Sequence, residues 1–166
     1  ESTRATDNYE AERTVDAFHV GFDFLIEDWV RIASGVRNES FSQEVVTFEL
    51  FDPDNAPVIA NLDSNNLLPS VAATIFLPDD HEIRLGYSKT VTRPDFKELS
   101  PAFFIDPVLD REVIGNPDLV DGSITHWDAR WDKYFSPTEY ASLSVFYKEF
   151  TNPIEIIVLA GTANII

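Results

Sequence analysis

The sequence predicts an all-β protein, an antiparallel up-and-down meander of about six to seven strands. Apolar residues alternate with polar ones far more often than they recur at helical spacing, which is the pattern of strands with two unlike faces. The alternating runs come in pairs separated by short polar turns, as β-hairpins require. No window approaches the roughly 18 uninterrupted apolar residues of a membrane-spanning helix, so any membrane crossing has to use strands.

The first predicted hairpin occupies residues 18–37, with its turn at Glu27 and Asp28. In its first strand one face is apolar and the other is polar apart from Leu25. The apolar face consists of Phe18, Val20, Phe22, Phe24 and Ile26. Because the alternation continues through residues 30–37, the two strands form one hairpin with an apolar and a polar face.

Two more hairpins repeat this unit, and a further apolar run at residues 154–159 is the candidate seventh strand. Each hairpin again has a short polar turn between two alternating strands. In chain order, their strands and turns are residues 71–77, 78–81 and 83–88, then 127–133, 136–138 and 141–148.

The connections between hairpins, residues 38–66 and 91–122, are long, rich in Asp, Asn and Pro, and longer than usual in a compact domain. The first of them contains six acidic residues and no Lys or Arg: Glu39, Glu44, Glu49, Asp52, Asp54 and Asp63. Short turns at one end and long polar loops at the other are typical of outer-membrane barrels, with the short turns periplasmic. The sequence therefore predicts part of a transmembrane β-barrel with long, acidic extracellular loops.

Alternation alone leaves a second fold open, because a soluble antiparallel sheet also has one apolar and one polar face. In that alternative the chain is a soluble β-sandwich or small barrel whose long loops bind a ligand such as a glycan. The two folds differ in where the apolar face goes: into a core between two sheets, or outward as a continuous band with aromatic rims.

Composition excludes several classes of function. Twelve Lys and Arg against 29 Asp and Glu give a net charge of −17, which argues against nucleic acid as a partner. Cysteine is absent, so there is no disulfide framework and no thiolate nucleophile or metal ligand. The sequence also lacks a phosphate-binding or dinucleotide glycine loop, a G-x-S-x-G elbow and an H-E-x-x-H motif. We therefore assign no catalytic and no cofactor-binding residues and expect no enzyme; an outer-membrane barrel enzyme would need a nucleophile and base that the sequence does not reveal.

Candidate metal ligands are few. His19, His81 and His126 stand far apart without carboxylates at ligand spacing, so each is read as an ordinary polar residue. The stretch 52–55, Asp-Pro-Asp-Asn, is similar to a calcium loop but lacks its glycine and its distal glutamate. A solvated acidic turn is the favoured interpretation, and no metal site is assigned.

Four segments in a fixed order point to one family. They are residues 67–70 (LLPS), 79–101 (DDHEIRLGYSKTVTRPDFKELSP), 115–119 (GNPDL) and 144–155 (SVFYKEFTNPIE). Together these segments resemble the barrel of TonB-dependent outer-membrane receptors. The resemblance covers roughly residues 14–155 and is strongest over 67–119. Upstream, residues 35–37 (GVR) are similar to a family signature, although Asn38 stands where an aromatic residue is common.

The resemblance implies a segment of an outer-membrane transporter of a Gram-negative bacterium. Such a transporter imports a scarce nutrient, such as siderophore-bound iron, cobalamin or an oligosaccharide, and is energised by TonB. The implied partners are the TonB complex, a plug domain, outer-membrane lipid and the small-molecule nutrient. We expect residues 1–166 to be a fragment of the barrel domain, without the plug and without the C-terminal closing strand; the substrate-binding residues stay unassigned.

Several residues have expected structural roles. Pro94, after Arg93, cannot donate to a strand ladder and should end the strand before it. In the segment 115–117, Gly115 tolerates a positive φ and Pro117 biases its neighbour toward extended geometry, so the segment should turn the chain back. Four charged residues should face the barrel lumen, where they could contact the plug, although a solvated wall is favoured for each. These are Arg84, Arg130, Asp132 and Lys148.

Overall fold

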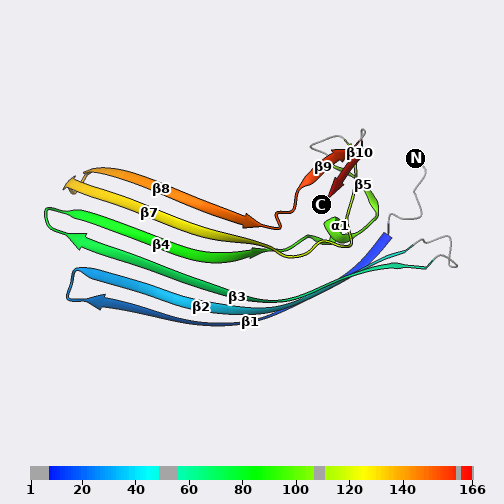
Figure 1. The fold of residues 1–166 in the computed structure, drawn as a ribbon, viewed down its shortest axis with the longest axis horizontal. Coiled ribbons are helices and arrows are strands. Elements are labelled where there is room, and N and C mark those ends of the chain that lie inside the picture. Colours follow the sequence, from blue (N-terminus) through cyan, green and yellow to red (C-terminus); the bar gives the residue numbers. More distant parts are fainter. Residues whose placement is uncertain (1–7, 49–55, 107–110, 160–161, 166) are drawn as a thin grey trace.

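The computed structural model describes residues 8–48, 56–106, 111–159 and 162–165. Its main body is an antiparallel six-stranded sheet in the order β1-β2-β3-β4-β7-β8 (Figure 1). The strands are β1 (Asn8–Ile26), β2 (Val30–Phe48), β3 (Val58–Leu77), β4 (His81–Thr92), β7 (Gly122–Ser136) and β8 (Glu139–Thr151). This confirms the predicted all-β meander and its three hairpins.

The short turns lie together at one end of the sheet (Figure 1). In the β1–β2 turn Glu27 and Asp28 have φ values of 47° and 58°, and in the β3–β4 turn Asp79 and Asp80 have values of 59° and 57°. Pairs of residues with positive φ form the turns whose twist matches that of the flanking strands, and Asp tolerates this conformation. The local sequence therefore fixes both of these turns.

The prediction of a long loop at residues 38–66 is wrong. β2 continues to Phe48 and β3 begins at Val58, and their pairing extends as far as Thr47 and Val58. Glu44 and Asp63 therefore lie on strands. Polar residues such as Ser42, Glu44 and Asp63 occupy the outward face of an extended hairpin. On the other face of β2, Phe41, Gln43, Val45 and Thr47 are buried. The stretch 52–55 lies outside the described residues.

The connection between β4 and β7 runs from residue 93 to 121, close to the predicted 91–122, and its described residues are structured. It contains helix α1 (Phe96–Leu99) and strands β5 (Phe103–Asp106) and β6 (Arg111–Ile114). These two strands form a second sheet, β5-β6-β10-β9, with β9 (Ile156–Leu159) and β10 (Thr162–Ile165). The apolar run at 154–159 does supply a strand, β9, but that strand belongs to the second sheet and does not extend the main one.

The cross-strand register separates the side chains of the main sheet into two faces. We call one the polar face; near the short turns it carries residues such as Asp23, Arg31, Arg84, Arg130 and Lys148. The apolar face carries the alternate residues. Between the short turns and the middle of the sheet, this face takes every second residue of each strand. The stretches are Phe18 to Ile26 on β1, Val30 to Val36 on β2, Leu67 to Leu77 on β3, Ile83 to Tyr87 on β4, Trp127 to Trp131 on β7 and Ala141 to Tyr147 on β8.

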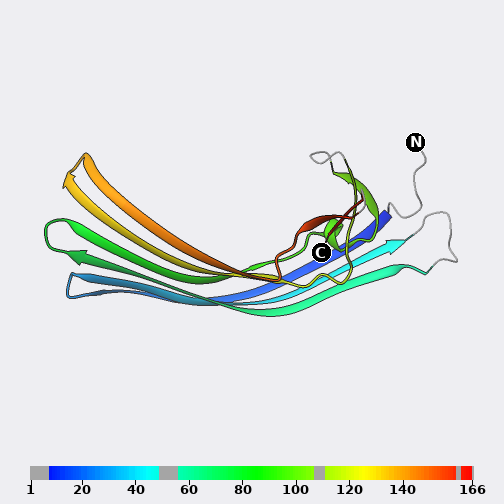
Figure 2. The ribbon, with the colours of Figure 1, turned by 45° about the horizontal axis from the view of Figure 1, so that its top comes forward.

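The packed core lies at the end of the sheet opposite the short turns. Here α1 and the second sheet lie on the concave side of the bowed main sheet (Figure 2). Phe41, Val45, Ala60 and Leu62 from β2 and β3 pack against Leu99 of α1, Val113 and Leu119. Many large side chains of the apolar face stay exposed, and no described element covers them. The apolar face thus points outward, which does not fit the soluble sandwich.

Within the described residues, no helix is long and apolar enough to cross a membrane.

Candidate functional site: the polar face and the capping segment

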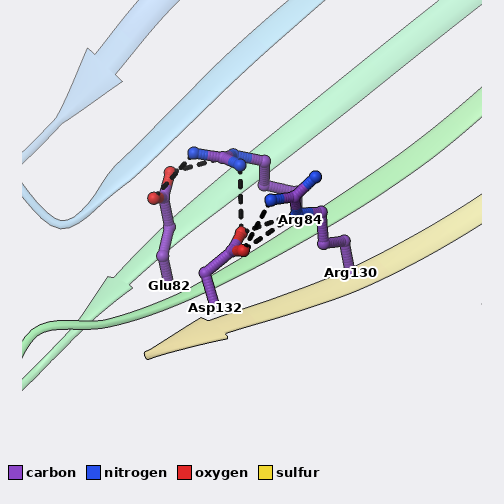
Figure 3. Close-up of polar contacts among 4 residues, drawn as sticks. All are labelled: Glu82, Arg84, Arg130 and Asp132. Carbon is purple, nitrogen blue, oxygen red and sulfur yellow. Dashed lines mark hydrogen bonds and ion pairs between the residues drawn. The ribbon is translucent and has the colours of Figure 1, made fainter. Parts of the chain in front are cut away.

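The polar face carries a cluster of four charged side chains near the short turns (Figure 3). Arg84 of β4 donates from Nη1 to Asp132 Oδ2 of β7 at 3.0 Å and from Nη2 to Glu82 Oε2 at 2.8 Å. Arg130 Nη2 lies 2.8 Å from Asp132 Oδ1. We call Glu82, Arg84, Arg130 and Asp132 the charge cluster. The register creates it, because Glu82 pairs with Asp132 and Arg84 with Arg130 across β4 and β7.

Two further guanidinium groups of the polar face, those of Arg31 and Arg37, are also paired. Arg31 donates to both carboxylate oxygens of Asp23, at 3.0 and 2.6 Å. Arg37 donates from Nε to Glu39 Oε1 at 2.5 Å. Charge-assisted pairs with two hydrogen bonds have a defined geometry as well as a favourable energy. The polar face therefore presents fixed, internally neutralised pairs rather than free charges at these positions.

Three of the four residues predicted to face the lumen are brought together in the charge cluster. The fourth, Lys148, lies on the same face opposite His126. Its Nζ lies 5.9 Å from the ring centroid of Phe146, which is an ordinary cation–π distance. Sequence reasoning identified the shared face correctly, but it did not identify Glu82 as the fourth member of the cluster.

A shallow depression of about 690 Å³ lies beside the charge cluster on the same sheet. Small side chains line much of it: Gly21, Ala33, Gly35, Ser70, Ala72, Gly86 and Ser88. His19, Asp23 and Asp128 contribute the polar groups. Because short side chains leave the backbone accessible, another polypeptide or a ligand can approach the sheet closely here.

The three histidines do not form a metal site. His126 Nε2 lies 2.9 Å from Thr90 Oγ1, and His81 Nδ1 accepts a hydrogen bond from Trp131 Nε1 at 3.1 Å. His19 lies beside Gly21 and Gly35. In the described part of the chain, no three His, Cys, Asp or Glu residues gather as metal ligands.

We call the described residues 93–106 and 111–121 the capping segment, since they cover the polar face of β2 and β3. β4 ends at Thr92, as predicted from Pro94. The carbonyl of Pro94 accepts hydrogen bonds from Gln43 Nε2 at 3.3 Å and from Arg13 Nη2 at 3.4 Å. Asp95 then caps α1 and forms a capping box with Glu98. Two neighbouring strands thus fix the start of the capping segment.

Gly115 has a different role from the one expected. Its φ does not lie in the left-handed region, but a Cβ at this position would be 2.2 Å from the Ser100 oxygen and 2.5 Å from the Lys97 oxygen. The next residue, Asn116, donates its backbone N–H to the Glu98 oxygen at 2.6 Å. Glycine is therefore needed because the backbone after β6 packs directly on the end of α1. The structural role is confirmed, but the reason given for it was wrong.

Sequence reasoning missed a polar cluster at the base of the capping segment. Arg93 Nη1 lies 2.8 Å from Glu39 Oε2, and the guanidinium lies over the Phe41 ring, 4.4 Å from its centroid. Asp121, at the other end of the segment, lies 3.8 Å from Arg93 Nε and accepts from Asn66 Nδ2 at 2.8 Å. The only signal in the sequence was a basic residue, Arg93, directly before Pro94 at the end of a strand. Glu39 is one of the acidic residues from which a loop is predicted, but it lies on β2.

Two arginines act on Glu39. The hydrogen bond from Arg37 and then that from Arg93 hold the pKa of this carboxyl below its usual value. A carboxyl with a lowered pKa in the folded state stabilises that state above the titration range of the unfolded group. This contribution is lost as the pH falls through the lowered pKa, so the cluster is intact at neutral pH.

The charge cluster gives a first prediction. Asp132→Asn removes the charge that Arg84 and Arg130 share, and we expect a clear drop in the thermal unfolding midpoint of the full-length protein in detergent. Glu82→Gln should lower it less, because Arg84 keeps Asp132. Ser142→Ala, opposite Asp132 on β8, is the control and should leave the midpoint unchanged. If Asp132→Asn and Glu82→Gln lowered the unfolding midpoint equally, Asp132 would not be the carboxylate on which both arginines depend.

Comparison with known proteins agrees with this architecture. Residues 2–165 match the family model described as TonB dependent receptor-like, beta-barrel. No curated protein matches the sequence. Among solved structures, the chain is similar to the crystal structure of the siderophore receptor PirA from Pseudomonas aeruginosa, with a TM-score of 0.53 and 12% identity. The alignment covers 95% of this chain and 36% of that one, so the chain spans about a third of the length of PirA. At this identity the likeness to PirA shows the fold alone. The chain belongs to the TonB-dependent receptor-like β-barrel family.

Proposed function

We propose that this chain forms part of the wall of an outer-membrane transporter that imports a scarce nutrient with energy from TonB. The family consists of outer-membrane receptors and transporters rather than enzymes. Siderophore-bound iron is the substrate class we put first, because the similar solved structure is a siderophore receptor. Cobalamin and oligosaccharides are the alternatives.

The observation that carries the proposal is the change in character along the apolar face. On β1 this face is apolar and exposed from Phe18 to Ile26, and from Asp16 toward Asn8 it is polar and exposed. Nine residues of strand span roughly 26 Å at about 3.3 Å per residue. Tilted by about 35–45°, this length covers roughly 18–21 Å along the membrane normal, somewhat less than the apolar band of roughly 25 Å that outer-membrane barrels turn toward lipid.

Aromatic side chains stand at both borders of this band. Tyr87 and Trp127 lie side by side near the polar end of the band, with ring centroids 4.5 Å apart. Trp131 and Phe135 lie near the short turns. Aromatic rings prefer the membrane–water interface, so these positions mark the two borders of the lipid-facing band. In this orientation the short turns are periplasmic and the capping segment is extracellular.

The strand lengths support the same orientation. β1 and β2 have 19 residues each and β3 has 20, whereas about 9–11 residues cross a bilayer. The upper halves of these strands therefore project into the external medium. Their polar face is covered by the capping segment. On this proposal, an incoming nutrient first meets the transporter at that segment.

The polar face lines the lumen in this arrangement. The charge cluster and the depression at Gly21, Gly35 and Gly86 would then face a plug domain of the complete transporter. Paired charges give such a wall a polar surface without leaving desolvated, unpaired ions when a plug packs against it. The plug, TonB and outer-membrane lipid are the partners that we propose for the complete protein.

The transport proposal is tested by uptake. We expect cells that carry the full-length protein to accumulate radiolabelled iron from a siderophore mixture, and to lose this uptake when the inner-membrane TonB protein is deleted. Labelled cobalamin and labelled oligosaccharides run in parallel identify the substrate class. Binding of these compounds without TonB-dependent accumulation of any of them would overturn the proposal.

A further inference from the structure

The apolar face of the main sheet contains a hollow of about 530 Å³ over β3, β4, β7 and β8. One row of side chains, in register across the four strands, forms its floor: Ala73, Leu85, Ala129 and Val145. The two alanines keep this floor low. The neighbouring rows carry large rings on β7, Trp127 on one side and Trp131 on the other. The register therefore produces the hollow by setting a row with small side chains between two rows with large ones.

An aromatic row borders the hollow on the side away from the short turns. It consists of Tyr87, Trp127 and Tyr147, which pair across β4, β7 and β8. Every side chain of the apolar face that lines the hollow is aliphatic or aromatic. A polar group placed in the hollow would give up its hydrogen bonds to water without gaining others from these side chains. The hollow therefore favours an apolar occupant.

A lysine continues the apolar face directly beyond the aromatic row. Lys89 lies two residues after Tyr87 on β4, so its side chain points to the same face, and it pairs with Thr125. Within the described residues, Lys89 forms no hydrogen bond and no ion pair. The same row contains a carboxylate, that of Glu149, but it lies two strands away, roughly 10 Å between backbones. The charge of Lys89 is thus available to an anion outside the chain.

The hollow and Lys89 match the two chemical parts of an anionic lipid. From Lys89 to Leu85 the strand advances by roughly 13 Å at about 3.3 Å per residue, a length that an extended acyl chain covers. Lysine can lay its apolar stem along the surface and keep its ammonium group at the level of lipid head groups. Surrounding lipid is as apolar as the hollow, so selectivity has to come from close packing of the chain and from the charge.

We propose that the hollow binds one acyl chain of an anionic, phosphate-bearing lipid whose phosphate contacts Lys89. The rings of Tyr87 and Trp127 lie between the two parts and pack against the upper carbons of the chain. The proposal rests on the proposed function in one respect, that the apolar face meets lipid. It goes further by assigning one lipid of stated chemistry to one place on that face.

The test of the charge is native mass spectrometry of the full-length protein in detergent. The protein is titrated with phosphatidylglycerol and, separately, with phosphatidylcholine that has the same acyl chains. We expect a preference of roughly fivefold for the anionic lipid, from the attraction of one lysine. Lys89→Gln should abolish this preference. Lys133→Gln is the control, because Lys133 also lies on the apolar face but donates to the Asp79 carbonyl near the short turns; it should keep the preference.

The test of the hollow is Ala129→Phe, which fills the floor. Binding of both lipids should weaken by roughly tenfold, the loss of about two packed methylene groups. Ala141→Phe makes the same change on the apolar face outside the hollow and should bind lipid as the unchanged protein does. Equal affinity of the unchanged protein for the two lipids, or equal binding by the two phenylalanine variants, would overturn the proposal.

A second copy of this chain is the other possible occupant of the hollow. A dimer that carries no lipid and is disrupted by Ala129→Phe would show that occupant and overturn the lipid site. The titration contains no nutrient and no TonB, so its result is separate from the uptake experiment. Uptake without a lipid preference would overturn only the lipid site, and a lipid preference without uptake would overturn only the transport proposal.

Discussion

Replacing Val145 with arginine is expected to destabilise the membrane-inserted protein by about 2–4 kcal/mol, the cost of a basic side chain near the middle of a lipid-facing surface. Val145 lies in the middle of the apolar stretch of β8 and is 61% exposed. The side chain has no described protein neighbour above it that could pair with a charge. The measurement is the free energy of unfolding in urea after folding into lipid vesicles.

Ser142→Arg is the matched control for this experiment. It introduces the same side chain on the same strand, but on the polar face, opposite Asp132. Because Ser142 is exposed, an arginine there can keep its guanidinium in water and should change the free energy of unfolding by less than about 1 kcal/mol. Equal costs at the two positions would show that the apolar face does not contact lipid, and the proposed orientation would then fail.

The second large effect is expected at Gly115. A methyl group there meets the backbone oxygens of Ser100, Lys97 and Glu98, none of which can move without shifting α1. Overpacking of this kind typically costs about 1–3 kcal/mol. We expect Gly115→Ala to detach the capping segment locally, which hydrogen exchange of residues 96–100 would detect as faster exchange, while exchange in β7 and β8 stays unchanged.

Gly86→Ala provides the comparison. A Cβ at Gly86 would be 3.5 Å from the Asp128 Cβ, which is ordinary van der Waals contact. This variant should therefore leave hydrogen exchange in the capping segment as it is. If both variants exchange alike, the close approach of the backbone at Gly115 has no energetic consequence and the packing argument is wrong.

Short-range patterns predicted much of the main sheet. Period-two alternation and the turns rich in Asp or Pro placed the three hairpins and assigned residues such as Arg84 and Asp132 to one face. The same logic failed for residues 38–66. There the outward face carries Ser, Asn, Asp and Glu in place of the apolar residues on which the alternation depended.

Contacts between distant segments were beyond the reach of the sequence pattern. Strand register brings Glu82 into the charge cluster, and that register depends on the turn before β4 and on the pairing with β7. The polar cluster at the base of the capping segment joins Glu39, Arg93 and Asp121 from three separate stretches, and no local periodicity links them. The same holds for Gly115, whose constraint comes from α1 and not from its own turn.

The second sheet has a consequence for the order in which the chain folds. β5 and β6 can pair as soon as both exist, since they are close in sequence. β10, however, pairs in parallel with β6, and the whole β7–β8 hairpin lies between them in the chain. Closing so long a loop before the hairpin forms has a large entropic cost. The second sheet is therefore completed late, after β7 and β8 have joined the main sheet. A complete second sheet indicates that these strands of the main sheet have already formed.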